Sequence, residues 1–188
     1  MPLYPGLLIS TKRNSERSAS SEIHFVLTNK LEIEADLIHV ADTRISGLIT
    51  VKLDQSVDTH QLIRDMIALE KEDSYFMHCL KIRPIDHTLG FELDNLVKHI
   101  ENQQIDRPGT FRIMVNKRHN PIASLEVIKP IANLFPNNKV DLNEPDWEIW
   151  IEIVAYTVGY AVIEPELVFS TDLAYVEEDD NVPNWFLD

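Results

Sequence analysis

The order of apolar patterns in the first 88 residues is the feature that most constrains the fold. Period-two alternation and β-rich composition indicate strands, whereas apolar residues spaced three and four apart indicate helices. The segments run strand, helix, strand, strand, helix, strand, and they cover residues 5–11, 15–30, 37–40, 48–53, 58–72 and 76–85. This order predicts a ferredoxin-like β-α-β-β-α-β unit.

Polar residues precede both helical patterns in this unit. Ser15 is predicted to cap the first helix, because its hydroxyl oxygen can accept a free backbone N–H, and Glu16 suits the positive end of the helix dipole. Asp58 or Thr59 is predicted to cap the second helix. Cys79, the single cysteine, is expected to be a small buried apolar residue rather than half of a disulfide.

A second α/β unit follows from about residue 89. Helical spacing over residues 93–100 precedes a strand that begins TFRIMV and a helix over residues 124–135, for which Ser124 is the predicted cap and in which Pro130 is expected to cause a kink. Residues 147–153 and 157–163 then predict a closing hairpin. The chain is therefore expected to be an α+β, two-layer protein with three parts: an N-terminal domain at 1–88, a second domain at 89–172 and an acidic tail at 173–188.

The distribution of charge separates one basic segment from an acidic chain. The formal net charge is −14, yet residues 96–130 contain six basic and three acidic side chains, whereas residues 131–188 contain one basic and thirteen acidic side chains. A local basic patch matters more for docking a polyanion than the total charge does. Nucleic acid therefore stays among the possible partners.

Motifs for the common catalytic chemistries are missing from the sequence. It has no glycine-rich phosphate loop, no GxSxG, no HExxH and no CxxC, and its histidines lack short ligand spacing. We therefore expect no cofactor, no metal site and no enzymatic activity. The acidic residues Asp141, Glu144, Asp146, Glu148 and Glu152 are expected to form a solvated face rather than a hard-cation site.

The strongest binding signal lies where the strand after residue 110 leads into the next helix. Lys117 and Arg118 stand beside Asn116, and Arg112 shares a strand face with Asn116 by alternation. Free N–H groups in the first turn of a helix attract phosphate, so the helix start at Ser124 would complete an anion site. The alternative interpretation is an ordinary polar loop.

This segment and the one that follows it resemble the THUMP domain of tRNA-modifying enzymes. The resemblance is carried by TFRI at 110–113, Lys117-Arg118, Ser124, VDL at 140–142, Pro145-Asp146 and IEI at 151–153, in that order and at matching spacing. It extends over about residues 5–170, since THUMP domains usually follow a ferredoxin-like domain. It implies RNA contacts, at the acceptor stem and 3′ end of tRNA, by five residues: Arg112, Asn116, Lys117, Arg118 and Ser124.

The resemblance also bears on partners. It is closest to stand-alone THUMP proteins, including the adaptor of an acetyltransferase that forms N4-acetylcytidine in tRNA. Because no catalytic domain follows Asp172 in this chain, a separate tRNA-modifying enzyme is expected to perform the chemistry. The sequence has no apolar run of membrane-spanning length and no signal-like start, so a cytoplasmic location without membrane contact is expected.

Two other functions stay open from the sequence. A protein-interaction scaffold could use the acidic C-terminal region, with Trp185 and Phe186 as apolar anchors for a basic partner. A small enzyme with carboxylate chemistry has only its acid content in its favour.

Overall fold

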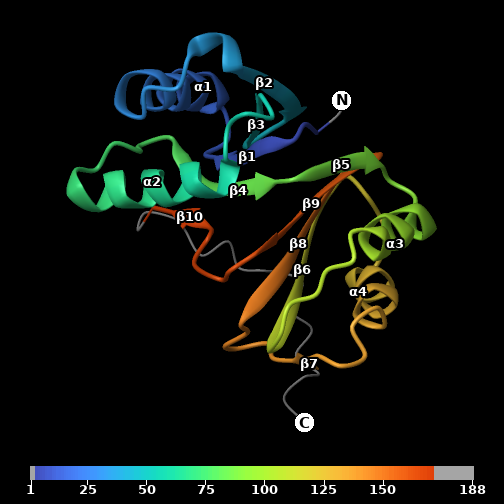
Figure 1. Cartoon of the computed structure of the whole chain (residues 1–188). Coiled ribbons are helices and arrows are strands. Elements are labelled where there is room, and N and C mark those ends of the chain that lie inside the picture. The colour runs from blue at the N-terminus through green and yellow to red at the C-terminus, as the bar shows by residue number, and fades with distance from the viewer. Residues whose placement is uncertain (1–2, 172–188) are drawn as a thin grey trace.

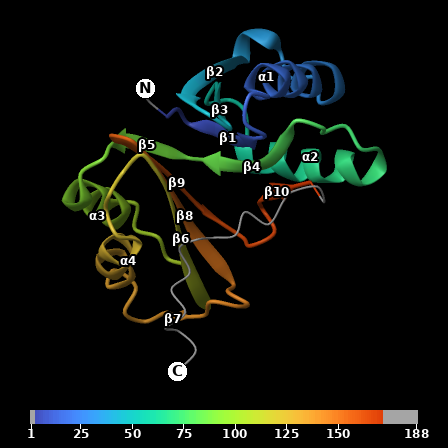
Figure 2. The same cartoon turned by 180° about the vertical axis from the view of Figure 1, so that it is seen from behind.

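The structure is a computed structural model that describes residues 3–171. Figure 1 shows two β-sheets, each with a pair of helices, and Figure 2 shows the same layers from behind. The predicted acidic tail lies outside the described residues, and so do Trp185 and Phe186. Within the described part, no helix is both long and apolar enough to cross a membrane.

The first module has the predicted β-α-β-β-α-β order. Its strands are arranged β4-β1-β3-β2 with antiparallel neighbours, which is the ferredoxin-like arrangement. A short fifth strand near the end of the described chain, β10, pairs with β4. The elements are β1 (Gly6–Thr11), α1 (Glu16–Phe25), a π-helical turn η1 (Val26–Lys30), a 3-10 turn η2 (Ala35–Leu37), β2 (Ile38–Ile45), β3 (Leu48–Leu53), α2 (Thr59–Glu72), β4 (Cys79–Ile85) and β10 (Phe169–Ser170).

The second module contains a mixed sheet of order β5-β9-β8-β6-β7. β6 is parallel to both β7 and β8, whereas β9 is antiparallel to β5 and β8. Sequence patterns did not predict β5, β7 or β10, and α4 ends three residues before the predicted Phe135. The elements are β5 (His87–Gly90), α3 (Leu93–Asn102), β6 (Thr110–Arg118), α4 (Ser124–Ala132), β7 (Lys139–Val140), β8 (Trp147–Val154) and β9 (Thr157–Ile163).

The two predicted helix caps in the first module differ in outcome. The Asp58 side chain accepts a hydrogen bond from the Gln61 N–H at 3.0 Å and caps α2 as predicted. Ser15 occupies the cap position of α1, but its side chain makes no capping hydrogen bond. The prediction for the Ser15 hydroxyl was therefore wrong. Cys79 is fully buried, as expected.

Strand alternation divides each sheet into a helix-covered face and a face that meets the other module. In β1, Leu7 and Ile9 pack with α1 and α2, whereas Leu8 packs in a cluster with Val154 of β8. In the second sheet, the face opposite Val154 packs against α3 and α4 through residues such as Ile149 and Ile151. Figures 1 and 2 both show α3 and α4 on the same side of that sheet. The modules therefore pack through the helix-free faces of their sheets.

A buried ion pair crosses the boundary between the modules. Arg83 of β4 lies 3.1 Å from a carboxylate oxygen of Glu152 on β8, and the two side chains are 5% and 2% exposed. Arg83 also donates to the Ser10 hydroxyl and lies over the Trp150 ring. Charges buried this deeply persist only when they are paired. This contact holds the relative position of the modules.

Candidate nucleic-acid interface

The loop between β6 and α4 is held by the turn between β8 and β9. The Ala155 N–H donates to the Arg118 carbonyl at 2.8 Å, and the Asn120 amide donates to the Ala155 carbonyl at 2.8 Å. The Asn120 side-chain oxygen in turn accepts from the Ile122 N–H at 3.0 Å. The exposed His119 adopts a left-handed backbone conformation at φ 56°. The loop thus has a defined shape rather than an extended one.

The start of α4 differs from the predicted cap. Ala123 occupies the cap position and Ser124 is the first helical residue, so the prediction that Ser124 caps this helix was wrong. The hydrogen bonds of Asn120 fix the path by which the chain enters α4. The cap position therefore falls at Ala123, one residue before the predicted Ser124. Glu126 accepts from the Ala123 N–H at 3.4 Å and puts a carboxylate in the first turn. A negative side chain there competes with phosphate for the positive helix end.

Arg112 is used in a contact inside the second module. Its guanidinium donates to Glu148 through Nε at 3.0 Å and also through Nη2, while Nη1 donates to the Leu142 carbonyl at 2.6 Å. The Glu148 side chain is only 1% exposed. The pairing follows from the register, which places Arg112 opposite Glu148 on the neighbouring strand. Arg112 therefore compensates a buried charge.

Asn116 is engaged in the same way two rungs further along β6. Its side-chain amide donates to Glu152 at 2.8 Å, beside the Arg83 contact. The sequence predicted that Glu148 and Glu152 belong to a solvated acidic face. That prediction is wrong for these two residues. They are buried because the face they occupy packs against the first module, and basic or amide groups satisfy them. Among the described residues, no group of three or more His, Cys, Asp or Glu side chains is placed to hold a metal ion.

Lys117 and Arg118 lie on opposite faces of β6. The Lys117 amine donates to the Ile122 carbonyl at 2.7 Å and helps to close the loop. Arg118 is half-buried, and its guanidinium has no hydrogen bond or ion pair with the described part of the chain. The two cations therefore do not form a joint fork, and only the Arg118 side chain has all of its donors free within the described part of the chain.

Side chains from both modules line a shallow pocket that includes His119, the residue after Arg118. Arg44, near the end of β2, and His119 line this pocket of about 510 Å³. Thr43, Ile45, Val154 and Ala155 complete its wall. The Arg44 guanidinium has no ion pair with the described residues. The pocket shows that the end of β2 lies near the β6–α4 loop.

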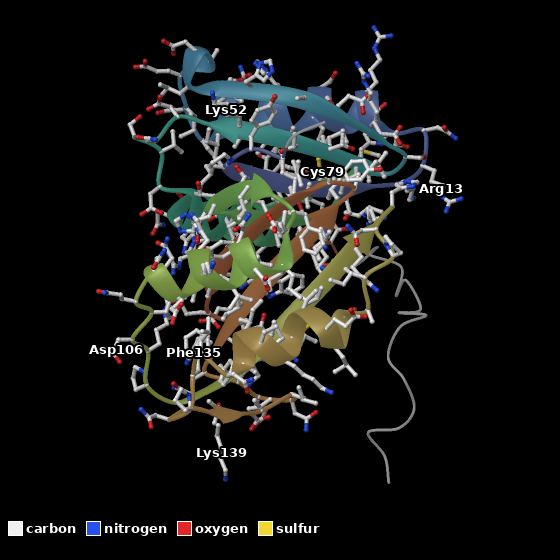
Figure 3. All side chains as sticks on the ribbon, turned by 90° about the vertical axis from the view of Figure 1, so that its right-hand side faces the viewer. Arg13, Lys52, Cys79, Asp106, Phe135 and Lys139 are labelled. Atoms are coloured by element: carbon white, nitrogen blue, oxygen red, sulfur yellow. The ribbon has the colours of Figure 1, made fainter. Side chains whose placement is uncertain are left out.

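The loop between β1 and α1 adds two further cations next to the β2–β3 turn. The Thr11 N–H donates to the Gly47 carbonyl at 2.8 Å, and Lys12 and Arg13 follow as exposed side chains. Figure 3 shows Arg13 at the end of the molecule where β6 terminates, with Lys139 at the opposite end. We call the surface formed by these segments the junction surface; its cationic residues are Lys12, Arg13, Arg44 and Arg118, and His119 lies beside Arg118 in the sequence.

Sequence reasoning missed the part of this surface contributed by the first module. The adjacent pair Lys12-Arg13 is visible in the sequence, but nothing local indicates that it lies near residue 118. Only the order of strands and the packing of the modules bring these loops together. The single local signal for Arg44 is the polar turn between two strands.

Three other histidines, His60, His87 and His99, have structural contacts. His60 lies 2.9 Å from a carboxylate oxygen of Asp86, whose hydrogen bond raises the pKa of His60. His99 lies 2.7 Å from the Tyr160 hydroxyl, and His87 packs against the same ring. Burial lowers the pKa of His87 and raises that of Tyr160. These groups lie away from the three loops of the junction surface.

Residues 92–159, which span α3 to the start of β9, match the family model of the THUMP domain. This segment of the chain is therefore similar to the THUMP domain. A THUMP domain implies RNA binding and an association with tRNA modification. The match starts within the second module and includes the β6–α4 loop with Lys117 and Arg118.

Curated relatives carry the same domain in their names. The chain is 26% identical over 147 residues to THUMP domain-containing protein 1 of Mus musculus, and 25% identical over 168 residues to that of Homo sapiens. These alignments cover 73% and 84% of this chain but only 40% and 45% of the relatives. The chain thus spans less than half the length of the curated relatives it matches.

Solved structures share the fold of both modules. Thermus thermophilus TrmN aligns with a TM-score of 0.56 at 14% identity, covering 83% of this chain and 44% of that one. A 4-thiouridine synthetase in complex with RNA and bound ATP aligns with a TM-score of 0.53 at 13% identity, covering 84% of this chain and 41% of that one. The fold of THUMP-containing proteins therefore extends over both modules of this chain.

Proposed function

We propose that this chain is a non-catalytic tRNA-binding protein that holds the acceptor stem and 3′ end of tRNA and presents the RNA to a separate modifying enzyme. The observation that carries the proposal is the junction surface, where three loops from both modules bring together cations without carboxylate partners. Phosphate contacts with lysine and arginine supply most sequence-independent affinity for nucleic acid. The THUMP match supports RNA as the polyanion.

The contacts within the second module divide the five predicted binding residues by role. We propose Arg118 as a direct phosphate contact, since its guanidinium is free. Lys117 has one donor on the Ile122 carbonyl and can offer its remaining N–H groups. Ser124 presents its hydroxyl at the start of α4. We propose that Arg112 and Asn116 stabilise the strand behind the interface and do not contact RNA directly, because they already donate hydrogen bonds to Glu148 and Glu152.

Charge reversal tests the site directly. Arg118→Glu, Arg44→Glu and Arg13→Glu are each expected to weaken binding of a tRNA by about tenfold in a filter-binding or anisotropy titration, because each replaces attraction to phosphate with repulsion. The matched control is Lys139→Glu, which makes the same charge change on the exposed β7 at the far end of the molecule (Figure 3). Equal losses in all four variants would show that net charge, not the junction surface, governs binding.

Salt dependence gives a second measurement on the unmodified protein. About four phosphate contacts predict a log–log slope of affinity against salt of about −3 to −4. Arg118→Glu is expected to make this slope shallower, and Lys139→Glu to leave it unchanged. A slope near zero in the wild-type protein would contradict phosphate binding.

The adaptor role needs its own test. We propose that the separate enzyme is an acetyltransferase that forms N4-acetylcytidine. Adding the chain to such an enzyme and tRNA should raise the yield of acetylated cytidine, whereas the chain alone with acetyl donor should give none. Arg118→Glu should lower the yield in the mixture in proportion to its loss of tRNA affinity. Unchanged acetylation without the chain would refute the adaptor role and leave the binding site standing.

A further inference from the structure

The Glu16 carboxylate lies within the junction surface, where simple electrostatics would disfavour it. Glu16, the first residue of α1, places its Oε1 atom 2.5 Å from the Gly47 backbone nitrogen and 3.2 Å from that of Asn14. The Ser46 hydroxyl lies 3.3 Å from the same oxygen. All three donors therefore meet at one oxygen of Glu16.

These donors come from the two loops that carry the cations of the first module. Asn14 follows Lys12 and Arg13 in the β1–α1 loop, whereas Ser46 and Gly47 form the β2–β3 turn, just after Arg44 at the end of β2. Glu16 thus links one loop to the other. The Gly47 N–H has no other acceptor in the described part of the chain, so this hydrogen bond depends on the Glu16 side chain, whereas the Gly47 carbonyl accepts from the Thr11 N–H.

Asn14 in the β1–α1 loop and Arg44 near the end of β2 both lie in the left-handed backbone region. Asn14 has φ 64° and Arg44 has φ 60°. Left-handed conformations of residues other than glycine cost about 1 kcal/mol or more and persist only where surrounding contacts hold them. Asp42 holds the β2–β3 turn locally, since it accepts from the Arg44 N–H at 2.7 Å. Glu16 adds a side-chain connection between the two loops to the backbone hydrogen bond from Thr11 to Gly47.

We propose that Glu16 is a positioning residue that fixes Arg13 and Arg44 at the spacing at which they contact RNA. The inference rests on the proposed function of the junction surface. If Glu16 has this role, removing its side chain changes the affinity for RNA in the opposite direction to the effect of removing its charge alone. Removing a negative charge from a phosphate-binding surface should strengthen binding, whereas loss of the link should weaken it because the two cations no longer hold a common geometry.

Two substitutions separate these effects. Glu16→Gln and Glu16→Ala remove the same charge, but only glutamine retains a carbonyl oxygen where Oε1 accepts its three hydrogen bonds. Glu16→Gln is expected to bind tRNA at least as tightly as the wild-type protein. Glu16→Ala is expected to bind about five- to tenfold more weakly. Glu101→Ala, at an exposed position on α3, is the control for loss of one negative charge elsewhere.

A second readout tests the link itself. Amide hydrogen exchange at Gly47 should be slow in the wild-type protein and in Glu16→Gln, and fast in Glu16→Ala. Thermal unfolding of all variants above the assay temperature ensures that the binding data describe folded protein. If Glu16→Gln and Glu16→Ala bind tRNA with equal affinity, the proposal is wrong, whether that affinity is higher or lower than the affinity of the wild-type protein.

The outcomes also distinguish this inference from the proposed function. If Arg13→Glu and Arg44→Glu leave tRNA binding unchanged, the contribution of the first module to the binding site is wrong. If those variants lose affinity while Glu16→Gln and Glu16→Ala behave alike, the site stands and only the positioning role of Glu16 is wrong.

Discussion

At the scale of single residues, a basic side chain is available for RNA only when no acidic partner in the fold already uses its charge. Arg112 and Arg118 are both arginines on the same face of β6, yet Arg112 pairs with the buried Glu148 and Arg118 is free. The sequence predicts the shared face from alternation. It does not reveal the partner, because the register between β6 and β8 depends on residues 36 positions apart.

Arg112→Met is expected to destabilise the protein by roughly 2–4 kcal/mol, because Glu148 would stay buried without a counter-charge. Urea unfolding monitored by tryptophan fluorescence measures the change. Arg118→Met is the matched control and should change stability by less than about 0.5 kcal/mol. Equal stability of the two variants would mean that Glu148 does not depend on Arg112.

His60 predicts a small pH dependence of stability. Its pKa in the folded protein is raised by the hydrogen bond to Asp86, so its contribution is fully present below the unfolded value of about 6.5 and is lost as pH rises through the folded pKa. Wild type should therefore exceed His60→Gln in stability by more at pH 5.5 than at pH 8.5, with a difference under about 1 kcal/mol. Paired urea titrations at both pH values test the sign.

At the scale of elements, the sequence predicts the helices and strands that have their own apolar periodicity. It misses the short strands that form only by pairing with a neighbouring strand. The four helices and the long strands have apolar periodicity of their own, so they were located to within a few residues. β5, β7 and β10 are two to four residues long and exist because a neighbouring strand offers hydrogen bonds. The Ser124 cap failed for a related reason, since a tertiary contact with Asn120 sets the entry to α4.

Helix capping provides a matched comparison at this scale. Asp58→Ala should cost about 1 kcal/mol, because it removes the acceptor for the Gln61 N–H. Ser15→Ala should cost little, since the Ser15 hydroxyl makes no capping bond. Thermal denaturation by circular dichroism measures both. A larger loss for Ser15→Ala than for Asp58→Ala would contradict this assignment of the caps.

At the scale of the whole molecule, the arrangement of the modules creates the proposed interface. Neither module alone contains the junction surface, because its cations come from two loops of the first and one loop of the second. Sequence reasoning predicted two modules of the right classes but not their relative position. That position depends on the contact between helix-free faces, including Gly159, where an added Cβ would lie 2.8 Å from the Ile85 side chain.

The Arg83–Glu152 pair predicts coupling between the modules. Arg83→Met and Glu152→Met should each destabilise the protein by roughly 3–5 kcal/mol, because each leaves one buried charge unpaired. The double variant should be more stable than the sum of the two losses implies, since neither charge then remains. A double-mutant cycle measured by urea unfolding tests this, and strict additivity would contradict a direct interaction.

The strand β10 has a consequence for any attempt to transplant the THUMP segment. The second module begins after Asp86, just past the end of β4. At the other end of this module, Phe169 and Ser170 pair with β4, so the second module is joined to the first at both of its ends. Excising residues 92–159 would discard β5 and most of β9 and would bare the Trp150 side of the sheet to water. A graft of residues 92–159 alone would therefore match the family model but would lack strands that the second sheet needs.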